Sequence, residues 1–308
     1  MRTAPGRLLA GIAARDRAQA GPLALVPCDN LPDNGEVVGR ILHSMAELVG
    51  TDLVTWVEES VSMVATVIDR ITPRTQPEDV SAVTEATGMA DRAPVVAEPF
   101  AEWVLSGSFP RGRPRWEDAG ATFTDDIAPF EQRKLWLLNG AHSLLAYAGS
   151  ARGHATVAAA IADDTCTGWV EQWWDEASRH VQLPVADVAA YRAALVDRFT
   201  NPRISHRLEQ IAADGTQKLP VRILPILARE RAAGRVPSGA TLALGAWVWY
   251  VRSLGSALHD PLAEMIAPLA AGRLPDAVKR LLDALDPVVG ADEAIVAAVQ
   301  SHAEHLGH

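Results

Sequence analysis

Apolar residues recur at helical spacing through most of the chain, and one such stretch, residues 129–149, is apolar on most of its sides. Pro129 is placed to open a helix there and Gly149 to close it. A helix with so little polar surface is typically buried. This pattern therefore predicts a core helix over residues 129–149.

The same spacing predicts helices along the rest of the chain, with one short strand near the start. Residues 23–27 read as that strand, and no later segment carries a convincing strand signal. Residues 97–126 are rich in Gly, Pro and aromatic residues and predict a long ordered loop with a short helix. The remaining predicted helices are 7–19, 36–50, 52–61, 155–180, 187–200, 203–213, 223–233, 241–253, 262–270, 274–285 and 291–306. The pattern thus predicts a mainly α fold.

Composition narrows the class of protein. The 308 residues are 48% hydrophobic, which is enough for one large or two medium domains. A net charge of -10 argues against a nucleic-acid partner. No window approaches the 18 or so uninterrupted apolar residues of a membrane span, and no proper signal-peptide core forms, so we expect a cytoplasmic protein. Two cysteines, and nine histidines without HxxxH or HExxH spacing, predict no metal site.

The predicted core helix carries four polar side chains that can do chemistry. At about 100° per residue, they project into an arc of about 140°, so all four can face one cavity. Burial lowers the pKa of a lysine toward neutrality, where it can exchange a proton with an alcohol while Asn and His donate to the oxygen. The four are Glu131, Lys134, Asn139 and His142. The spacing alone equally permits an ordinary core helix, with a lysine that reaches solvent and a histidine whose hydrogen bonds are satisfied.

The run K-L-W-L-L-N-G-A-H-S from Lys134 to Ser143 resembles the lysine signature of the mannitol dehydrogenase family of polyol and uronate dehydrogenases, K-x-x-x-x-N-x-x-H. The resemblance implies that Lys134 is the general acid/base, that Asn139 and His142 hold the reacting oxygen, and that Glu131 helps to exchange the proton with solvent. It also implies NAD as the cofactor.

Two earlier segments are similar to the same family. In C-D-N-L-P-D-N-G, beginning at Cys28, the resemblance makes Asn30 a second donor to the substrate oxygen. Residues 61–73 resemble a family signature that places Asp69 and Arg70 at the substrate. Met63 departs from that signature, which prefers Phe there. Without the family, the first segment is an ordinary polar loop and Asp69–Arg70 an ordinary surface ion pair of small energetic value.

A basic run near residue 210 suggests an acidic substrate. His206, Arg207, Lys218 and Arg222 concentrate positive charge in an otherwise acidic chain. A guanidinium and an ammonium group suit a carboxylate, although a solvated loop that pairs with nearby Asp and Glu explains the run as well. The run is similar to the fructuronate reductase (mannonate dehydrogenase) branch of the family, which implies a hexuronate substrate bound by His206, Arg207 and Lys218.

The dinucleotide site expected of such an enzyme is not evident in the sequence. No glycine-rich turn of the G-x-G-x-x-G type follows a strand. We therefore expect residues 1–38 to be a short α/β remnant of a Rossmann domain, most of that domain to be missing, and residues 39–308 to form a multi-helical substrate and catalytic domain.

Together these observations predict an NAD-dependent oxidoreductase that interconverts a polyol or aldonic acid and its keto form, with D-mannonate and D-fructuronate favoured. Mannitol- or arabinitol-type specificity is one alternative. A catalytically inactive helical domain that binds a sugar acid or a protein is another. The chain is expected either as a monomer or as a protein that associates through the exposed edge of strand 23–27.

Overall fold

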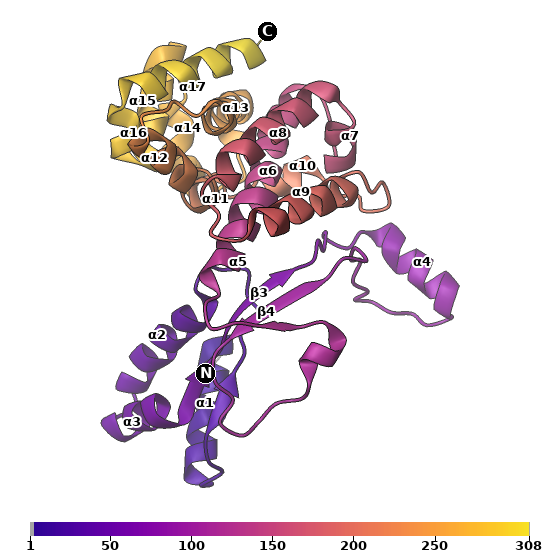
Figure 1. The fold of residues 1–308 in the computed structure, drawn as a ribbon, viewed down its shortest axis with the longest axis vertical. Helices are drawn as coiled ribbons and strands as arrows, with labels where there is room; N and C mark the ends of the chain where they lie inside the picture. The colour runs from indigo at the N-terminus through magenta and orange to yellow at the C-terminus, as the bar shows by residue number, and fades with distance from the viewer. Residues whose placement is uncertain (1–2, 308) are drawn as a thin grey trace. The chain divides into compact units, whose positions relative to one another are not determined.

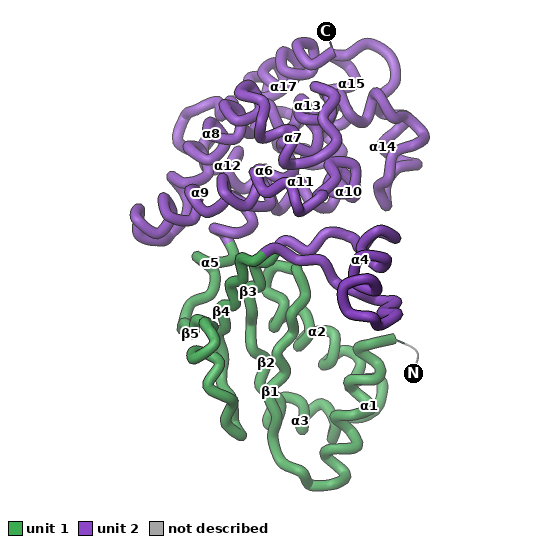
Figure 2. The backbone as a smooth tube through the Cα atoms, turned by 90° about the vertical axis from the view of Figure 1, so that its right-hand side faces the viewer, with its two compact units in different colours: residues 1–70, 99–131 green, residues 71–98, 132–308 purple. Residues whose placement is uncertain are grey.

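The computed structural model describes residues 3–307, which divide into two compact units (Figure 2). Unit 1 contains the chain up to Arg70 and the segment Pro99–Glu131. Unit 2 contains Ile71–Glu98 and the chain from Gln132 onward. The predicted boundary after residue 38 stays a prediction.

Among the described residues, unit 1 contains three complete helices, five short strands and the start of α5 (Ala128–Arg133) (Figure 1). Its hydrophobic core forms between the helices, from Leu9, Ile12, Leu42, Ala46, Leu53 and Val57. The helices are α1 (Ala4–Arg17), α2 (Asn34–Glu47) and α3 (Thr51–Ser60). The strands are β1 (Leu23–Leu25), β2 (Val61–Met63), β3 (Ala65–Asp69), β4 (Glu102–Ser106) and β5 (Thr122–Phe123), with a 3-10 turn, η1 (Trp116–Ala119).

The strands form two sheets. β1 and β2 are parallel, with Leu23 opposite Val61 and Leu25 opposite Met63, and α2 and α3 lie between them in the chain. β4 is the middle strand of the second sheet, antiparallel to β3 and parallel to β5. Parallel strands need a long crossover, which α2 and α3 supply here.

The prediction that no strand follows Val26 was wrong, because β2 to β5 all lie beyond it. Residues 61–69 are rich in β-branched Val, Thr and Ile, the residue types that fit a pleated, half-buried surface. Residues 102–106 pair with β3 from more than 30 residues away, so the loop-like composition around them concealed a strand fixed by a distant partner.

The regular elements of unit 2 within its described residues are helices (Figure 1). Its elements are α4 (Pro77–Thr87), α6 (Gly140–Leu144), α7 (Val157–Ile161), α8 (Asp164–Ser178), α9 (Val185–Phe199), α10 (Leu208–Ala212), α11 (Gly215–Arg222), α12 (Leu224–Ala232), α13 (Ser238–Leu254), α14 (Ala263–Leu269), α15 (Leu274–Leu285), α16 (Pro287–Ala291) and α17 (Glu293–Leu306), with the π-helical turns η2 (Lys134–Asn139) and η3 (Leu145–Gly149) and the 3-10 turn η4 (Gly255–Ala257). The prediction of a mainly helical chain is confirmed.

Helix α13 lies at the centre of unit 2 and packs against α8, α17 and η3. All ten residues from Gly239 to Val248 are buried. Its N-terminus is closed by Glu176 of α8, whose carboxylate accepts hydrogen bonds from the backbone N–H groups of Gly239 (2.8 Å) and Ala240 (3.0 Å). A negative charge at a helix N-terminus is favourable, so this contact ties α8 to α13.

Some predicted helix limits differ from the structure. The stretch 155–180 is two helices, α7 and α8, because Asp163 caps α8 by accepting from the Thr165 N–H. Neither α11, which begins at Gly215 after its N-cap Asp214, nor α4 was predicted. None of the helices within residues 3–307 is both long enough and apolar enough to cross a bilayer.

The loop after β1 is held by a buried asparagine. The Asn34 side chain, 1% exposed, donates to the Asp29 and Thr66 carbonyl oxygens at 3.0 and 2.9 Å and accepts from the Thr66 N–H at 3.0 Å. Thr66 Oγ1 in turn donates to the Pro27 carbonyl at 2.6 Å. Residues 27–33, which include Asn30, are thereby attached to β3.

Replacing Asn34 with Ala should therefore destabilise the protein. The change leaves buried backbone groups without partners, each costing about 1–3 kcal/mol, so we expect a loss of roughly 2 kcal/mol or more in the free energy of unfolding in urea. Gln300→Ala, which removes an amide whose hydrogen bond is exposed, is the control and should change it by less than about 0.5 kcal/mol. A loss no larger in Asn34→Ala than in the control would contradict this role.

Candidate functional site

The helix predicted over residues 129–149 is present but is not a plain α-helix. It begins at Ala128 with α5 (Ala128–Arg133) and continues through η2, α6 and η3. Within η2 the Gly140 N–H bonds to the Leu135 carbonyl five residues earlier. Gly149 does not close the helix, which continues to residue 151 before Gly153 adopts a left-handed conformation with φ of 82°. π-helical turns are rare and often lie at functional sites.

Three of the predicted catalytic side chains lie on this helix in unit 2. Lys134 is half-buried, whereas Asn139 and His142 are 7% and 5% exposed. Asn139 Nδ2 and His142 Nε2 are buried, and neither has a hydrogen-bond partner within residues 3–307. Buried polar atoms of this kind are rare and require an explanation. A core histidine with all its hydrogen bonds satisfied, the ordinary interpretation of the sequence, does not describe His142.

Two rings hold the His142 imidazole in place. Phe199 of α9 stacks on it, with ring centroids 4.7 Å apart and planes inclined by 26°. His206 meets it edge-on, with centroids 4.9 Å apart. The structure thus brings His206, predicted from the basic run, next to the histidine of the lysine signature.

Both imidazoles are neutral at neutral pH. Burial, with a smaller contribution from His206, Arg222 and Arg198, lowers the pKa of His142 well below its usual value. Burial, with Lys218 adding positive charge, lowers the pKa of His206 to about 4. A neutral imidazole can donate one hydrogen bond and accept another.

Arg222 of α11 approaches the same helix. Its Nη1 lies 3.4 Å from the Asn139 carbonyl oxygen and 3.2 Å from Ser143 Oγ. Burial lowers the pKa of this guanidinium to about 10. Within the part of the chain that the structure describes, no carboxylate lies within ion-pair distance of Arg222.

Lys218 and Arg207, the other two cations of the basic run, behave differently. Lys218 Nζ donates to the carbonyl oxygens of Ile211 (3.0 Å) and Ala213 (2.6 Å), and burial lowers the pKa of Lys218. The Arg207 side chain is 57% exposed and lies 4.0 Å from Glu209. Arg207 therefore matches the solvated interpretation of the basic run more closely than a ligand site.

The remaining predicted site residues lie in unit 1. Asn30 is exposed, in the loop that Asn34 anchors. Asp69 is fully buried at the end of β3, whereas Arg70 is exposed. Glu131 is buried and accepts a hydrogen bond from the Asp33 N–H at 3.1 Å. The functional roles of these four residues stay predictions.

The sequence analysis did not recognise the importance of α8 for the site helix. Trp173 and Trp174 of α8 are buried, 0% and 1% exposed. Their indole N–H groups donate to the carbonyl oxygens of Trp136 (2.8 Å) and Leu137 (2.9 Å) in η2. The N–H of a buried Trp usually has a hydrogen-bond acceptor. Two adjacent tryptophans in a predicted helix were therefore the sequence signal for such contacts.

One group of side chains has the composition of a metal site. His154, Asp163 and Cys166 present ligand atoms within 4.8 Å of one another. The same Asp163 carboxylate accepts from Arg152 Nε at 2.5 Å and caps α8, while burial raises the pKa of the Cys166 thiol to about 11. The Arg152 guanidinium already neutralises the Asp163 carboxylate. The contacts of Asp163 are therefore explained by its role as the N-cap of α8, without a metal ion.

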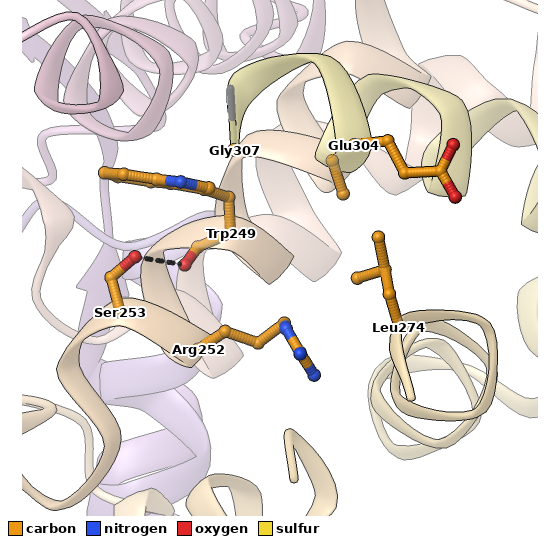
Figure 3. A pocket seen from close by; sticks show the side chains of 7 residues that line it. Trp249, Arg252, Ser253, Leu274, Glu304 and Gly307 are labelled. Atoms are coloured by element: carbon orange, nitrogen blue, oxygen red, sulfur yellow. Dashed lines mark hydrogen bonds between the residues drawn. The ribbon is translucent and has the colours of Figure 1, made fainter. Parts of the chain in front are cut away.

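A cavity of about 340 Å³ lies elsewhere in unit 2, between α13, α15 and α17 (Figure 3). Arg252 and Glu304 are its charged lining residues. Arg252 donates to the carbonyl oxygens of Ala270 and Gly272, and Glu304 accepts from Gln300. Its charged groups thus already have partners, and none of its lining residues belongs to the predicted site.

The chain thus contains an α/β unit with parallel strands and a larger helical unit that carries a Lys–Asn–His helix. Two family descriptions match the chain: the mannitol dehydrogenase Rossmann domain over residues 1–118, and the mannitol dehydrogenase C-terminal domain over residues 126–306. The chain belongs to the mannitol dehydrogenase family.

Individual relatives agree with this assignment. The chain is 36% identical to the uncharacterized oxidoreductase YeiQ of Escherichia coli over 88% of its own length and 57% of the relative's. It is 32% identical to the D-mannonate oxidoreductase of E. coli (88% and 56%) and 35% identical to the mannitol 2-dehydrogenase of Cereibacter sphaeroides (80% and 52%). The chain thus spans little more than half the length of these relatives.

A solved structure is similar along nearly the whole chain. Pseudomonas fluorescens mannitol 2-dehydrogenase, determined as a ternary complex with NAD and D-mannitol, has a TM-score of 0.87 at 32% identity. The match covers 99% of this chain and 64% of that one.

The expectation that most of the Rossmann domain is missing and only a short remnant remains was wrong. The family's Rossmann domain matches residues 1–118, well beyond residue 38. The error has a physical origin: β2 to β5 were taken for loop and helix, so the α/β part of the chain was underestimated.

The lowered pKa values of His142 and His206 predict a loss of stability in mild acid. Below about pH 6.5 the unfolded histidines bind protons that the folded ones, with lowered pKa values, do not. Stability should therefore fall between pH 7 and pH 5, by up to about 2 kcal/mol per histidine.

Urea unfolding at pH 7 and pH 5 measures this effect. His206→Gln should reduce the loss, whereas Gln300→Ala, which removes no titratable group, should not. An equal pH dependence in His206→Gln and the parent protein would contradict the prediction.

Proposed function

We propose that the protein is an NAD-dependent oxidoreductase that interconverts a secondary alcohol and a ketone on a polyol or sugar acid. The observation that carries this proposal is the buried pair of unpaired atoms, Asn139 Nδ2 and His142 Nε2, on the helix of Lys134. An alcohol or carbonyl oxygen would supply the missing partner for both. In this proposal Lys134 takes the hydroxyl proton in oxidation and returns it in reduction.

The neighbouring groups suit such a reaction. Asn139 would donate a hydrogen bond to the oxygen as negative charge develops there, and so would His142 in its Nε2–H tautomer. Both donors are already in position before the reaction, so no reorganisation is needed when the charge forms. The lowered pKa of His142 keeps the ring neutral, so it would polarise the oxygen without surrendering a proton. Phe199 and His206 restrict the motion of the imidazole.

The backbone arrangement of unit 1 is suited to binding a dinucleotide. β1 and β2 are parallel, and the loop 26–33 leaves β1 at its carboxyl end, where open α/β sheets bind ligands. A Cβ on Gly35 would lie 3.0 Å from the Ala65 nitrogen, so glycine permits α2 to start close against the β3 strand. The loop 26–33 and the first turn of α2 would hold the cofactor. When bound, NAD would supply the hydride acceptor or donor.

Among substrates we favour a hexuronate or aldonate, in the direction of D-mannonate and D-fructuronate. Arg222 is a largely buried cation that forms no ion pair within residues 3–307, and it lies against the site helix. A buried cation is costly unless an opposite charge accompanies it, which a substrate carboxylate would provide. The name of the E. coli D-mannonate oxidoreductase supports this choice. The names of the mannitol 2-dehydrogenases support the alternative, a neutral polyol.

Lys134→Ala should abolish turnover of fructuronate and fructose with NADH at every accessible pH, because it removes the amine that exchanges the proton with the substrate hydroxyl in this proposal. Circular dichroism should show an unchanged fold. Lys279→Ala, which removes a lysine that is 58% exposed, is the control and should keep full activity. Substantial activity in Lys134→Ala would remove the lysine from its assigned role.

Arg222→Leu should separate the two substrate classes. Loss of the carboxylate partner should lower kcat/KM for fructuronate roughly 100-fold more than for fructose. Arg203→Ala, at an exposed arginine, is the control for net charge. Equal losses on the two substrates would argue against carboxylate recognition by Arg222 and for the neutral polyol.

A further inference from the structure

Two indole N–H groups reach backbone carbonyls inside the π-helical turn that begins at Lys134. Trp173 Nε1 lies 2.8 Å from the Trp136 oxygen, and Trp174 Nε1 lies 2.9 Å from the Leu137 oxygen. Both donors and both acceptors are buried, where such bonds are stronger than in water. Side chains that insert hydrogen bonds into a helix ladder are a recognised cause of departures from α-helical geometry.

The π-helical turn changes the direction in which the functional side chains project. An α-helix advances about 100° per residue and would set Asn139 about 140° around the axis from Lys134. A π-helical turn bonds residues five apart, as Gly140 and Leu135 are here, so each residue turns through a smaller angle. Asn139, and with it His142 in α6, therefore turns toward the side of the helix that carries Lys134.

The position of the Trp173 ring is closely defined. A Cβ added to Gly140 would lie 2.6 Å from Trp173 Cζ2 and 2.7 Å from Trp173 Nε1, so only glycine at this position lets the indole approach the turn. On the same helix, Glu176 is bonded to the N-terminus of α13. α8 is thus fixed to the core of unit 2 while its two indoles bond to η2.

We infer that Trp173 and Trp174 are positioning residues, whose indole hydrogen bonds hold the π-helical turn and so place Lys134, Asn139 and His142 on one side of the helix. The inference rests on the proposed function for its catalytic consequence, but not for its structural one. Neither tryptophan acts on the substrate directly.

The kinetic test replaces each tryptophan with Phe, which keeps an aromatic ring and removes the N–H. We expect kcat to fall roughly 10- to 100-fold, because small misplacements of catalytic groups have effects of this size. KM should change by less than about threefold, since the substrate-contacting side chains remain. Trp169→Phe is the matched control. Trp169 also lies on α8, but its ring contacts Arg152 and lines a pocket with residues of α13 and α17.

A second readout does not depend on turnover. The chain has three lysines, Lys134, Lys218 and Lys279, so lysine labelled with ¹³C at Cε gives three resonances that Lys218→Arg and Lys279→Arg assign. In Trp173→Phe and Trp174→Phe the Lys134 resonance should shift, and the Gly140 amide should exchange faster with solvent. In Trp169→Phe both should match the parent protein.

If a Phe variant fails to fold, benzothienylalanine at the same position keeps the shape of tryptophan and replaces only the N–H with sulfur. An unmoved Lys134 resonance and unchanged Gly140 exchange in the folded variants would overturn the inference. Should the parent protein turn over neither substrate, the proposed function fails, while the lysine resonance and amide exchange still decide the role of the two tryptophans.

Discussion

The hydrogen bonds from two adjacent indoles of α8 to the carbonyl oxygens of Trp136 and Leu137 connect the core of unit 2 to the helix of Lys134. Through Glu176 the same α8 closes the N-terminus of α13, a helix that is buried throughout from Gly239 to Val248. π-helical turns depart from the regular α-helical backbone geometry. Neighbouring elements supply additional hydrogen-bond donors to this helix, namely the two indoles of α8 and Arg222 of α11.

Burial shapes the electrostatics of this helix. His142 and His206 lie in contact, and both are kept neutral because removal from water disfavours the imidazolium form. Lys218 directs its donors to two backbone carbonyls, whereas Arg222 forms no ion pair within residues 3–307. Positive charge beside neutral donors favours an oxygen-rich, acidic ligand, and this balance underlies our choice of a sugar acid over a neutral polyol.

In unit 1 the side-chain amide of Asn34 holds the loop after β1 in place. Asn34 joins the loop after β1 to β3, and Gly35 beside it allows α2 to begin against the backbone of Val64 and Ala65. Loops that carry function are usually held by a rigid scaffold. The Asn34 network gives the loop containing Asn30 such support.

The sequence by itself determined the helix of Lys134, the residue types and spacing of Lys134, Asn139 and His142, and the mainly helical fold, because each follows from local periodicity. Only the tertiary structure decided the strands β2 to β5, whose pairing joins distant segments, and the burial of Asp69. It also decided the π-helical turns, which no local pattern encodes and which accept hydrogen bonds from indoles 37 residues away. Contacts of this kind depend on which elements pack together, and a linear pattern of apolar and polar positions does not specify that.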